Sequence, residues 1–229
     1  MLKRKPKVFV SDFNGTLFDD LLVSFNSVRE IFRIYDRPCP SMQEYREEAT
    51  ADYMKFYVNH GIPENTTRED LNKIRKDYYR IHSKNARMRP DIKNFIFWLN
   101  SSYWRNNKIH TAIVSAESSV ILFKELHRHD GMQKMFDFIK PEASGLKGKE
   151  KALLQVTEIF EVEPDEVVYL DDTVEGLTSA KNVGAVPVAF VNETSYSPER
   201  RLMNATKLSV RNLADLVFLL AIFNYKVQE

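Results

Sequence analysis

Side chains able to bind a cation or a phosphate follow short apolar runs at several places in the chain. Carboxylates follow two of these runs, a hydroxyl follows a third, and three lysines precede one of them. A pair of carboxylates can hold a hard cation such as Mg²⁺ through oxygen ligands. A hydroxyl, backbone N–H groups and an ammonium can hold phosphate oxygens, and a carboxylate aimed at the phosphorus can act as a covalent nucleophile. The residues are Asp12, Ser115, Lys147, Lys149, Lys151, Asp171 and Asp172.

The apolar runs have the length and composition of buried strands. They are rich in β-branched and aromatic residues and are bounded by polar or glycine-containing turns. Between them, apolar residues recur at every third and fourth position, which is typical of helices packed on a sheet. This alternation predicts an α/β fold with a doubly wound, Rossmann-like parallel sheet, whose sites lie beyond the carboxyl ends of the strands. The predicted strands are Val8–Val10, Ile109–Val114, Val167–Leu170 and Val186–Val191.

The stretch from about residue 20 to residue 89 breaks this alternation. Its pattern is helical almost throughout, and prolines and a glycine separate the segments. Successive helices without a strand between them do not extend a sheet, so we expect a helical cap over one end of the α/β domain. We predict a core of residues 1–19 and 90–229 and an inserted cap of residues 20–89. The expected cap helices lie near Leu21–Tyr35, Ser41–Asn59 and Thr67–Ser83.

The composition excludes several classes of protein. Because 33 Lys and Arg residues oppose 32 Asp and Glu residues, the net charge is only +1, and no overall field draws the chain to nucleic acid or to an anionic membrane. One cysteine, Cys39, excludes an internal disulfide and a multi-cysteine zinc site. The apolar stretch Leu216–Phe223 is far shorter than the roughly 20 residues of a membrane span. We expect a soluble, cytoplasmic protein, a monomer or weak dimer, whose partner is a small molecule.

Four motifs, in order along the chain, resemble those of the haloacid dehalogenase (HAD) superfamily. Asp12–Leu17 (DFNGTL) is similar to the first motif, normally D-x-D-G-T, and the strand ending in Ser115 (AIVS) is similar to the second. KEKALL from Lys149, followed by VEPDEVV, resembles the third, and Tyr169–Gly184 resembles the fourth in its acidic-pair form. Many members insert a helical cap where residues 20–89 lie here. The resemblance covers essentially the whole chain and implies a Mg²⁺-dependent phosphatase of a small phosphorylated metabolite.

The resemblance also implies a metal site. Asp12 would be both a metal ligand and the nucleophile that forms an aspartyl-phosphate. Asn14 would give its backbone carbonyl to the metal. Asp172 would be a direct ligand, and Asp171 would ligate the metal or orient a bound water.

The implied phosphate site combines a hydroxyl, a lysine and a loop. Ser115 would bind the transferring phosphoryl oxygens, and a lysine would neutralise charge between nucleophile and phosphate. Lys149 is the first choice for this lysine, and Lys147 fits another common form of the motif. The implied substrate-binding residues are Gly15, Thr16, Arg46, Ser115 and Ala116.

Asn14 departs from the family pattern. The phosphatase form has Asp at this position, which protonates the leaving oxygen and then activates water, whereas an amide cannot shuttle a proton. Such help is worth about 10²- to 10⁴-fold in rate, so we expect weak phosphatase activity. Three alternatives stay open: another acid substitutes (Glu117, Asp19 or Asp20), the substrate has a good leaving group, or the chain is a catalytically impaired binding or regulatory protein.

Structural roles compete with these assignments. Asp12 alone would suit an Asx turn, and Asp171 with Asp172 would suit a helix cap. Three lysines in five residues usually form a solvated face, so at most one should point inward. The aromatic residues of the expected cap should mostly form its small core, with a few facing a substrate: Tyr45, Tyr53, Phe56, Tyr57, Tyr78 and Tyr79.

Overall fold

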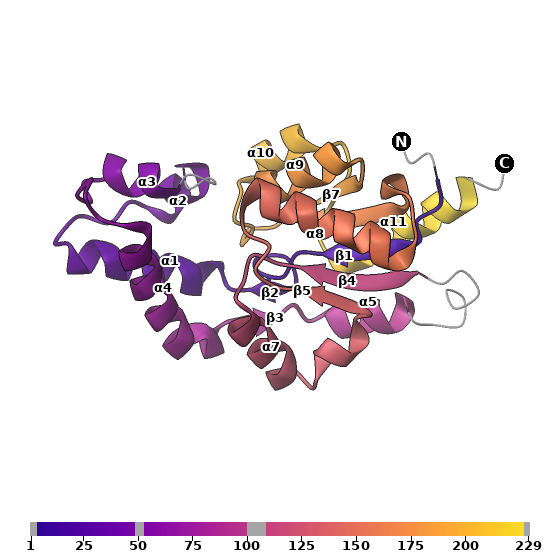
Figure 1. Cartoon of the computed structure of the whole chain (residues 1–229), viewed down its shortest axis with the longest axis horizontal. Coiled ribbons are helices and arrows are strands. Elements are labelled where there is room, and N and C mark those ends of the chain that lie inside the picture. The colour runs from indigo at the N-terminus through magenta and orange to yellow at the C-terminus, as the bar shows by residue number, and fades with distance from the viewer. Residues whose placement is uncertain (1–3, 49–52, 100–108, 227–229) are drawn as a thin grey trace.

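The sheet of the computed structural model, which describes residues 4–48, 53–99 and 109–226, has six strands in the order β5-β4-β1-β6-β7-β8. Every pairing in it is parallel, and β1 lies between β4 and β6. Figure 1 shows β1 beside β4. Buried β-branched and aromatic side chains fill the central strands, as expected for a sheet covered on both faces. The strands are β1 Val8–Ser11, β4 His110–Val114, β5 Phe138–Lys140, β6 Val167–Asp171, β7 Val186–Phe190 and β8 Ser209–Val210.

Side chains alternate between the two faces of β1 because successive residues of a strand point in opposite directions. Phe9 packs into one hydrophobic core, whereas Val8 and Val10 pack into another. The first core is covered by α5 Ile92–Leu99, α7 Ser119–Arg128 and α11 Leu213–Lys226, and the second by α8 Gly145–Phe160 and α9 Val174–Val183. A further helix, α10 Glu199–Ala205, packs against α9 and β7. Short 3₁₀ helices lie at Ser83–Asn85, Met132–Met135 and Pro164–Glu166.

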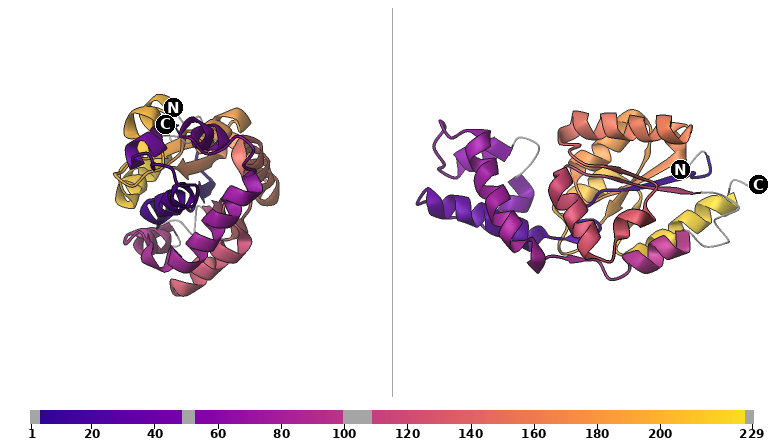
Figure 2. Two further views of the ribbon diagram at one scale, coloured as in Figure 1. Left: turned by 90° about the vertical axis from the view of Figure 1, so that its left-hand side faces the viewer. Right: turned by 60° about the horizontal axis from the view of Figure 1, so that its bottom comes forward.

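Four helices of the described residues form a separate layer beyond the carboxyl end of the sheet. This layer lies at the left of Figure 1 and again in the right-hand view of Figure 2. This layer has its own core, which contains Phe32, Phe56 and Tyr57. Aromatic rings dominate it, with ring centroids 5.4 Å apart for Phe56 and Tyr57. The helices are α1 Leu21–Ile34, α2 Met42–Glu48, α3 Tyr53–Asn59 and α4 Arg68–His82.

A short antiparallel pair joins the two parts of the chain. β2 Phe18–Asp19 leads into the helical layer, and β3 Arg87–Met88 leads out of it beside β2. Arg89 then donates its backbone N–H to the Leu17 carbonyl at 2.9 Å. The chain therefore enters and leaves the helical layer at one place, next to the end of β1.

These observations confirm the predicted α/β class with a parallel sheet and helices on both faces. The predicted strands are present, but β5 and β8 were not expected, because runs of three and two residues give no periodic signal. The helix expected at Ser41–Asn59 is two helices in the described residues, α2 and α3, and residues 49–52 lie outside the described part. The division into residues 1–19, 20–89 and 90–229 stays a prediction.

No helix in the described ranges combines the length and the apolar character needed to cross a bilayer.

Candidate active site

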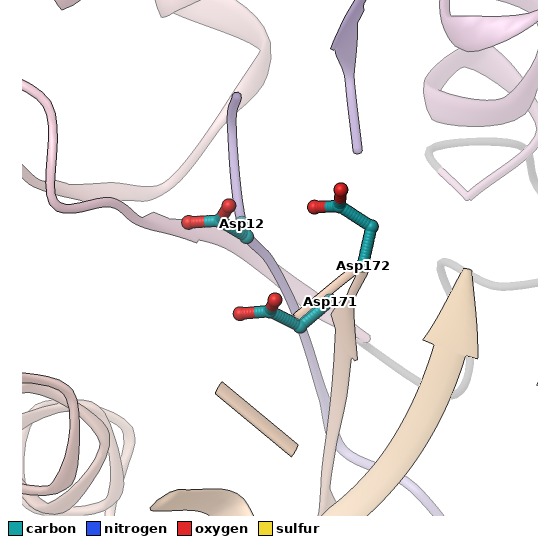
Figure 3. A group of neighbouring side chains, drawn as sticks. All are labelled: Asp12, Asp171 and Asp172. Carbon is teal, nitrogen blue, oxygen red and sulfur yellow. The ribbon is translucent and has the colours of Figure 1, made fainter. Parts of the chain in front are cut away.

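Three carboxylates meet where the neighbouring strands β1 and β6 end. Asp12 follows β1, Asp171 is the last residue of β6 and Asp172 follows it. One oxygen from each lies within 4.8 Å of the others, and Figure 3 shows the three side chains around one common space. Because the strands are parallel and paired in register (Ser11 with Leu170), their ends must coincide. All three are buried.

Lys149 supplies the positive charge of this cluster. Its Nζ lies 2.6 Å from Asp171 Oδ2 and 3.2 Å from Asp12 Oδ1, and its side chain is only 6% exposed. It projects from α8, whose Leu153 and Val156 pack on the sheet. Of the two candidate lysines, this is the one that reaches the carboxylates.

Lys147 lies elsewhere. Its side chain is 89% exposed and pairs with Glu150 at 2.8 Å. Residues 147 and 149 are two positions apart, about 200° around a helix, so they cannot share a face. The alternative spacing that made Lys147 a candidate for the phosphate-binding lysine does not match the geometry.

Fixed hydrogen-bond donors orient Asp171. Tyr169 donates its hydroxyl to Asp171 Oδ2 at 2.7 Å, and the backbone N–H and hydroxyl of Thr173 each donate to Oδ1 at 2.7 Å. Thr173 is also the N-cap of α9, so helix capping and carboxylate orientation coexist here. Only glycine fits at position 176, because an added Cβ would overlap the Asp171 carboxylate.

The loop after β1 and a second loop orient Asp172. Thr16 donates its hydroxyl to Asp172 Oδ1 at 2.9 Å, and the backbone N–H of Tyr196 donates to Oδ2 at 2.6 Å. Gly15 has a φ of +75°, and a Cβ there would overlap the Asp172 carboxylate. Asp12 has a different environment: within the described residues the only donor to its carboxylate is Lys149, which bonds Oδ1 and leaves Oδ2 available.

Burial and mutual repulsion make this cluster electrostatically strained. Burial raises the pKa of Asp12 to about 7; Lys149 opposes this shift and Asp171 adds to it. Burial also raises the pKa of Asp172 well above its ordinary value, with further contributions from Asp171 and Asp12. Burial alone would lower the pKa of Lys149, but the neighbouring Asp12 and Asp171 carboxylates outweigh this effect, so the pKa is raised. Three buried acids therefore share one buried base.

This donor set fits a divalent cation. Carboxylate oxygens are the ligands that Mg²⁺ prefers, and the cluster has one ammonium for three acids. A bound Mg²⁺ would offset the remaining negative charge that raises the pKa of Asp12 and Asp172. Asp12, Asp171 and Asp172 could each contribute an oxygen.

Asn14 faces a second polar cluster between the sheet and the helical layer. Its Nδ2 donates to Asp20 Oδ2 at 2.7 Å and to the Tyr79 hydroxyl at 3.1 Å. Asp20 also accepts hydrogen bonds from the Tyr79 hydroxyl at 2.7 Å, the Tyr196 hydroxyl at 3.1 Å and the Gly15 N–H at 3.0 Å. Burial raises the pKa of Asp20, and these donors only partly reverse the shift.

The three acids considered as substitutes for an Asp at position 14 lie at different distances from Asn14. Asp20 is in direct contact, whereas Glu117 Oε2 is 3.5 Å from Asn14 Nδ2. Asp19 instead points toward Arg89, 3.6 Å from its Nη1. Asp20 and Glu117 are thus placed near Asn14, and Asp19 is not.

Ser115 directly follows β4 and contacts Asn14 of the second cluster. Its side chain is buried and donates to Asn14 Oδ1 at 3.5 Å, while the Glu117 N–H donates to its Oγ at 3.1 Å. Ala116 is exposed. Arg46 lies on α2 and donates from Nη2 to the Ser197 carbonyl at 3.4 Å, so it connects the helical layer to the loop that follows β7.

Sequence reasoning missed the residues that support the carboxylates. Tyr169 looked like an ordinary apolar strand residue, although its position two residues before Asp171 places both on one face of β6. No sequence signal links Tyr196 to Asp172 or Asp20. Arg89, the last residue of the predicted cap, was not singled out as a site residue, but it donates to the carbonyls of Gly15 at 2.7 Å and Thr16 at 2.9 Å.

A model of the family described as haloacid dehalogenase-like hydrolase matches residues 9–191. A search of curated proteins gave no significant match. Similar solved structures include a conserved haloacid dehalogenase-like protein from Agrobacterium tumefaciens, with 19% identity, a TM-score of 0.75 and coverage of 96% of this chain and 99% of that one.

Two further structures show the same likeness. A predicted phosphoglycolate phosphatase from Haemophilus somnus is 13% identical, with a TM-score of 0.73 and coverage of 95% of this chain and 99% of that one. CbbY from Rhodobacter sphaeroides, in complex with phosphate, is 17% identical, with a TM-score of 0.72 and coverage of 92% and 96%. At these identities the likeness concerns the fold.

Proposed function

The chain belongs to the haloacid dehalogenase-like hydrolase family, and we propose that it is a Mg²⁺-dependent phosphatase of a small phosphorylated metabolite that works through an aspartyl-phosphate at Asp12. The observation that carries this proposal is the contact of one lysine, Lys149, with two of the three gathered carboxylates. A predicted phosphoglycolate phosphatase and a phosphate complex among the similar structures support it.

In the first step the Asp12 carboxylate attacks phosphorus. The P–O bond to the leaving group breaks as the Asp12–P bond forms, and Oδ2 is the oxygen free of a protein donor in the described residues. Lys149 separates the two anions that must approach each other. Ser115 would bind a transferring phosphoryl oxygen through its hydroxyl.

Mg²⁺, when bound, would offset the negative charge of the phosphoryl group and of the carboxylates. Asp12, Asp171 and Asp172 would hold it, together with the backbone carbonyl of Asn14. The fixed donors on Asp171 and Asp172 keep those two carboxylates aimed at the shared space.

Asn14 sets the expected rate. Protonation of the leaving oxygen and activation of the hydrolytic water both need a proton-transferring group, and the Asn14 amide can only donate and accept hydrogen bonds. We therefore propose slow turnover of alkyl phosphates and faster turnover of aryl phosphates, whose leaving groups need little protonation.

The helical layer acts in this proposal as a cap. The catalytic side chains are buried, and Tyr79 of α4 reaches the Asn14–Asp20 contact, so substrate entry requires movement of the helical layer. Its return over the bound substrate would exclude water from the phosphoryl group.

The test is turnover by the purified protein with Mg²⁺ against an aryl phosphate and a panel of phosphorylated metabolites. The proposal expects phosphate release that EDTA abolishes and that Asp12→Asn removes. Wild-type release no greater than that of the Asp12→Asn protein would overturn it.

A second candidate function is a catalytically impaired, phosphate-binding regulatory protein. The amide of Asn14, held by Asp20 and Tyr79 in place of a proton-transferring group, favours it. Calorimetric binding of a phosphate ester with Mg²⁺, without turnover of any ester, would support this candidate.

A further inference from the structure

Arg75 on α4 carries a positive charge that no carboxylate of the described residues neutralises at ion-pair distance. Its side chain is half-buried, and its hydrogen bond is from Nη2 to the Ser24 hydroxyl at 3.5 Å. Arg33, by contrast, pairs with Glu30 at 2.6 Å. A guanidinium stays protonated in a protein, so this charge is permanent.

Among the described residues, tyrosines are the main neighbours that influence the charge of this guanidinium. Four lie close enough to interact with its charge: Tyr45, Tyr53, Tyr57 and Tyr196. Neutral phenols solvate a cation only weakly, so they leave its charge available to an anion. Glu117 is an acid whose pKa the charge of Arg75 lowers, but its carboxylate accepts hydrogen bonds from the Ser118 N–H and hydroxyl.

Two further polar atoms of the described helical layer are buried without a hydrogen-bond partner. One is the hydroxyl of Tyr57, a residue that is 1% exposed, and the other is Nε of Arg46. Tyr57 interacts with the charge of Arg75. Buried polar groups without partners are costly in a protein interior, and a bound ligand is one way in which they become satisfied.

Arg75 also lies on the side of the helical layer that faces the proposed active site. Ser24, its partner, donates its backbone N–H to the Asp20 carbonyl at 2.9 Å, and Asp20 contacts Asn14. Tyr196, another neighbour of Arg75, bonds Asp172 through its N–H and Asp20 through its hydroxyl. The unpaired charge therefore faces the region between the helical layer and the carboxylate cluster.

We propose that Arg75 is a specificity-determining residue that binds a second anionic group of the substrate, a carboxylate or a phosphate, remote from the phosphoryl group that is transferred. The inference rests on the proposed phosphatase function and narrows its substrate class to phosphate monoesters with two anionic ends. A guanidinium suits either anion because its fork of N–H donors matches both. The Tyr57 hydroxyl would supply a further donor.

The experiment compares esters that differ only in the second anion. The carboxylate arm uses the phosphate monoesters of glycolate, 3-hydroxypropionate and 4-hydroxybutyrate, and the phosphate arm uses the bisphosphates of propane-1,3-diol and butane-1,4-diol. Each is paired with the alkyl phosphate of equal chain length. At least one anionic ester should have a KM about tenfold or more below that of its partner, and the arm that shows it identifies the anion.

Substitution of Arg75 should remove this preference. Arg75→Met should bring the KM ratio of that pair close to one, and Arg75→Lys should keep part of it because the charge remains without the fork. Lys76→Met, an exposed charge lost from the same helix, is the matched control and should keep the wild-type ratio. A wild-type ratio near one for every pair would overturn the proposal, as would an unchanged ratio in Arg75→Met or an equal loss for both members of the pair.

Calorimetry separates this inference from the proposed function. Binding of the same ester pairs to the Asp12→Asn protein with Mg²⁺ needs no turnover. If the wild type hydrolyses no ester, the phosphatase proposal fails, and an Arg75-dependent preference in binding still supports the anion site. If esters are hydrolysed but neither KM nor binding distinguishes the pairs, the anion site alone fails.

Discussion

Asn14 Nδ2 lies 2.7 Å from Asp20 Oδ2, so the amide at the second position of the first motif donates to a buried carboxylate six residues later. The chain thus has a carboxylate close to the place where the resemblance expects one, but the carboxylate belongs to the segment that enters the helical layer. Two tyrosine hydroxyls and one backbone N–H also bond this carboxylate. The loop after β1 and the helical layer consequently share one hydrogen-bond network.

Asn14→Asp should raise kcat for alkyl phosphates by about 10²-fold or more, and less for aryl phosphates. The new carboxyl would lie against Asp20, and repulsion between the two acids keeps one of them protonated near neutral pH, ready to protonate a leaving oxygen. Adding Asp20→Asn should remove that repulsion and shift the alkyl-phosphate optimum to lower pH. Steady-state kinetics with both ester classes check this, and equal gains for the two classes would show that the proton is handled elsewhere.

Lys149→Met should lower kcat/KM and stability far more than Lys147→Met. Loss of Lys149 leaves three buried acids without their base, so we expect at least about a 10²-fold loss in kcat/KM and a destabilisation of about 3–5 kcal/mol without Mg²⁺. Lys147 is exposed and pairs only with Glu150, so its loss should change stability by less than about 1 kcal/mol. Kinetics and urea unfolding of both variants provide the comparison. Similar losses in the two would contradict the assignment of the buried lysine.

Stability of the metal-free protein should fall as the pH rises from about 4 to 7. The pKa of Asp12 is about 7 in the folded state against an ordinary value of 3.8, so the folded state binds more protons over this window. Its contribution to stability is present below pH 3.8 and is lost as pH rises through 7. The raised pKa of Asp172 acts in the same direction.

Urea unfolding in EDTA across this pH range measures the effect. Asp12→Asn should flatten the dependence, and Mg²⁺ should stabilise the wild type most at the upper end, where the carboxylates are ionised. If the stability of the wild type in EDTA instead rises with pH, the raised pKa of Asp12 does not govern the pH dependence of folding.

Gly15→Ala should lose Mg²⁺ affinity, whereas Gly61→Ala should not. Both glycines have positive φ, +75° and +90°, so each substitution costs about 1–2 kcal/mol of backbone strain. Only at Gly15 would the added methyl overlap the Asp172 carboxylate; at Gly61 it would make ordinary contact with the Arg37 side chain. Isothermal calorimetry with Mg²⁺ and thermal unfolding separate the two effects. Equal Mg²⁺ affinity in both variants would mean that Asp172 is not a ligand.

Much of the core could be predicted because its strands are continuous apolar runs. β1, β4, β6 and β7 each show such a run, and the parallel class follows from the helices between them. β5 and β8 could not be predicted, since two or three residues at a sheet edge depend on the strand already beside them. Their pairing is a tertiary effect that local sequence does not encode.

The gathering of Asp12, Asp171 and Asp172 was predictable for a different reason. They lie at the ends of two neighbouring strands, and the topology of a parallel sheet places such ends together whatever the intervening sequence. The choice of Lys149 over Lys147 also had a sequence signal, because Lys149 shares a helical face with the buried Leu153 and Val156. The contacts of Tyr79 and Tyr196 had none, since they join segments 59 and 176 residues away from Asp20.

Asp20 and Arg89 bond the short loop after β1 to both connections between the sheet and the helical layer. Asp20, where the chain departs for the helical layer, bonds the Gly15 N–H, and Arg89, where the chain comes back, bonds the Gly15 and Thr16 carbonyls. Both connections to the helical layer are therefore bonded to the residues that orient the Asp172 carboxylate, Gly15 and Thr16. Because both connections are hydrogen-bonded to the loop, a tilt of the helical layer would also move the loop. Opening of the layer would therefore change the carboxylate geometry at the same time.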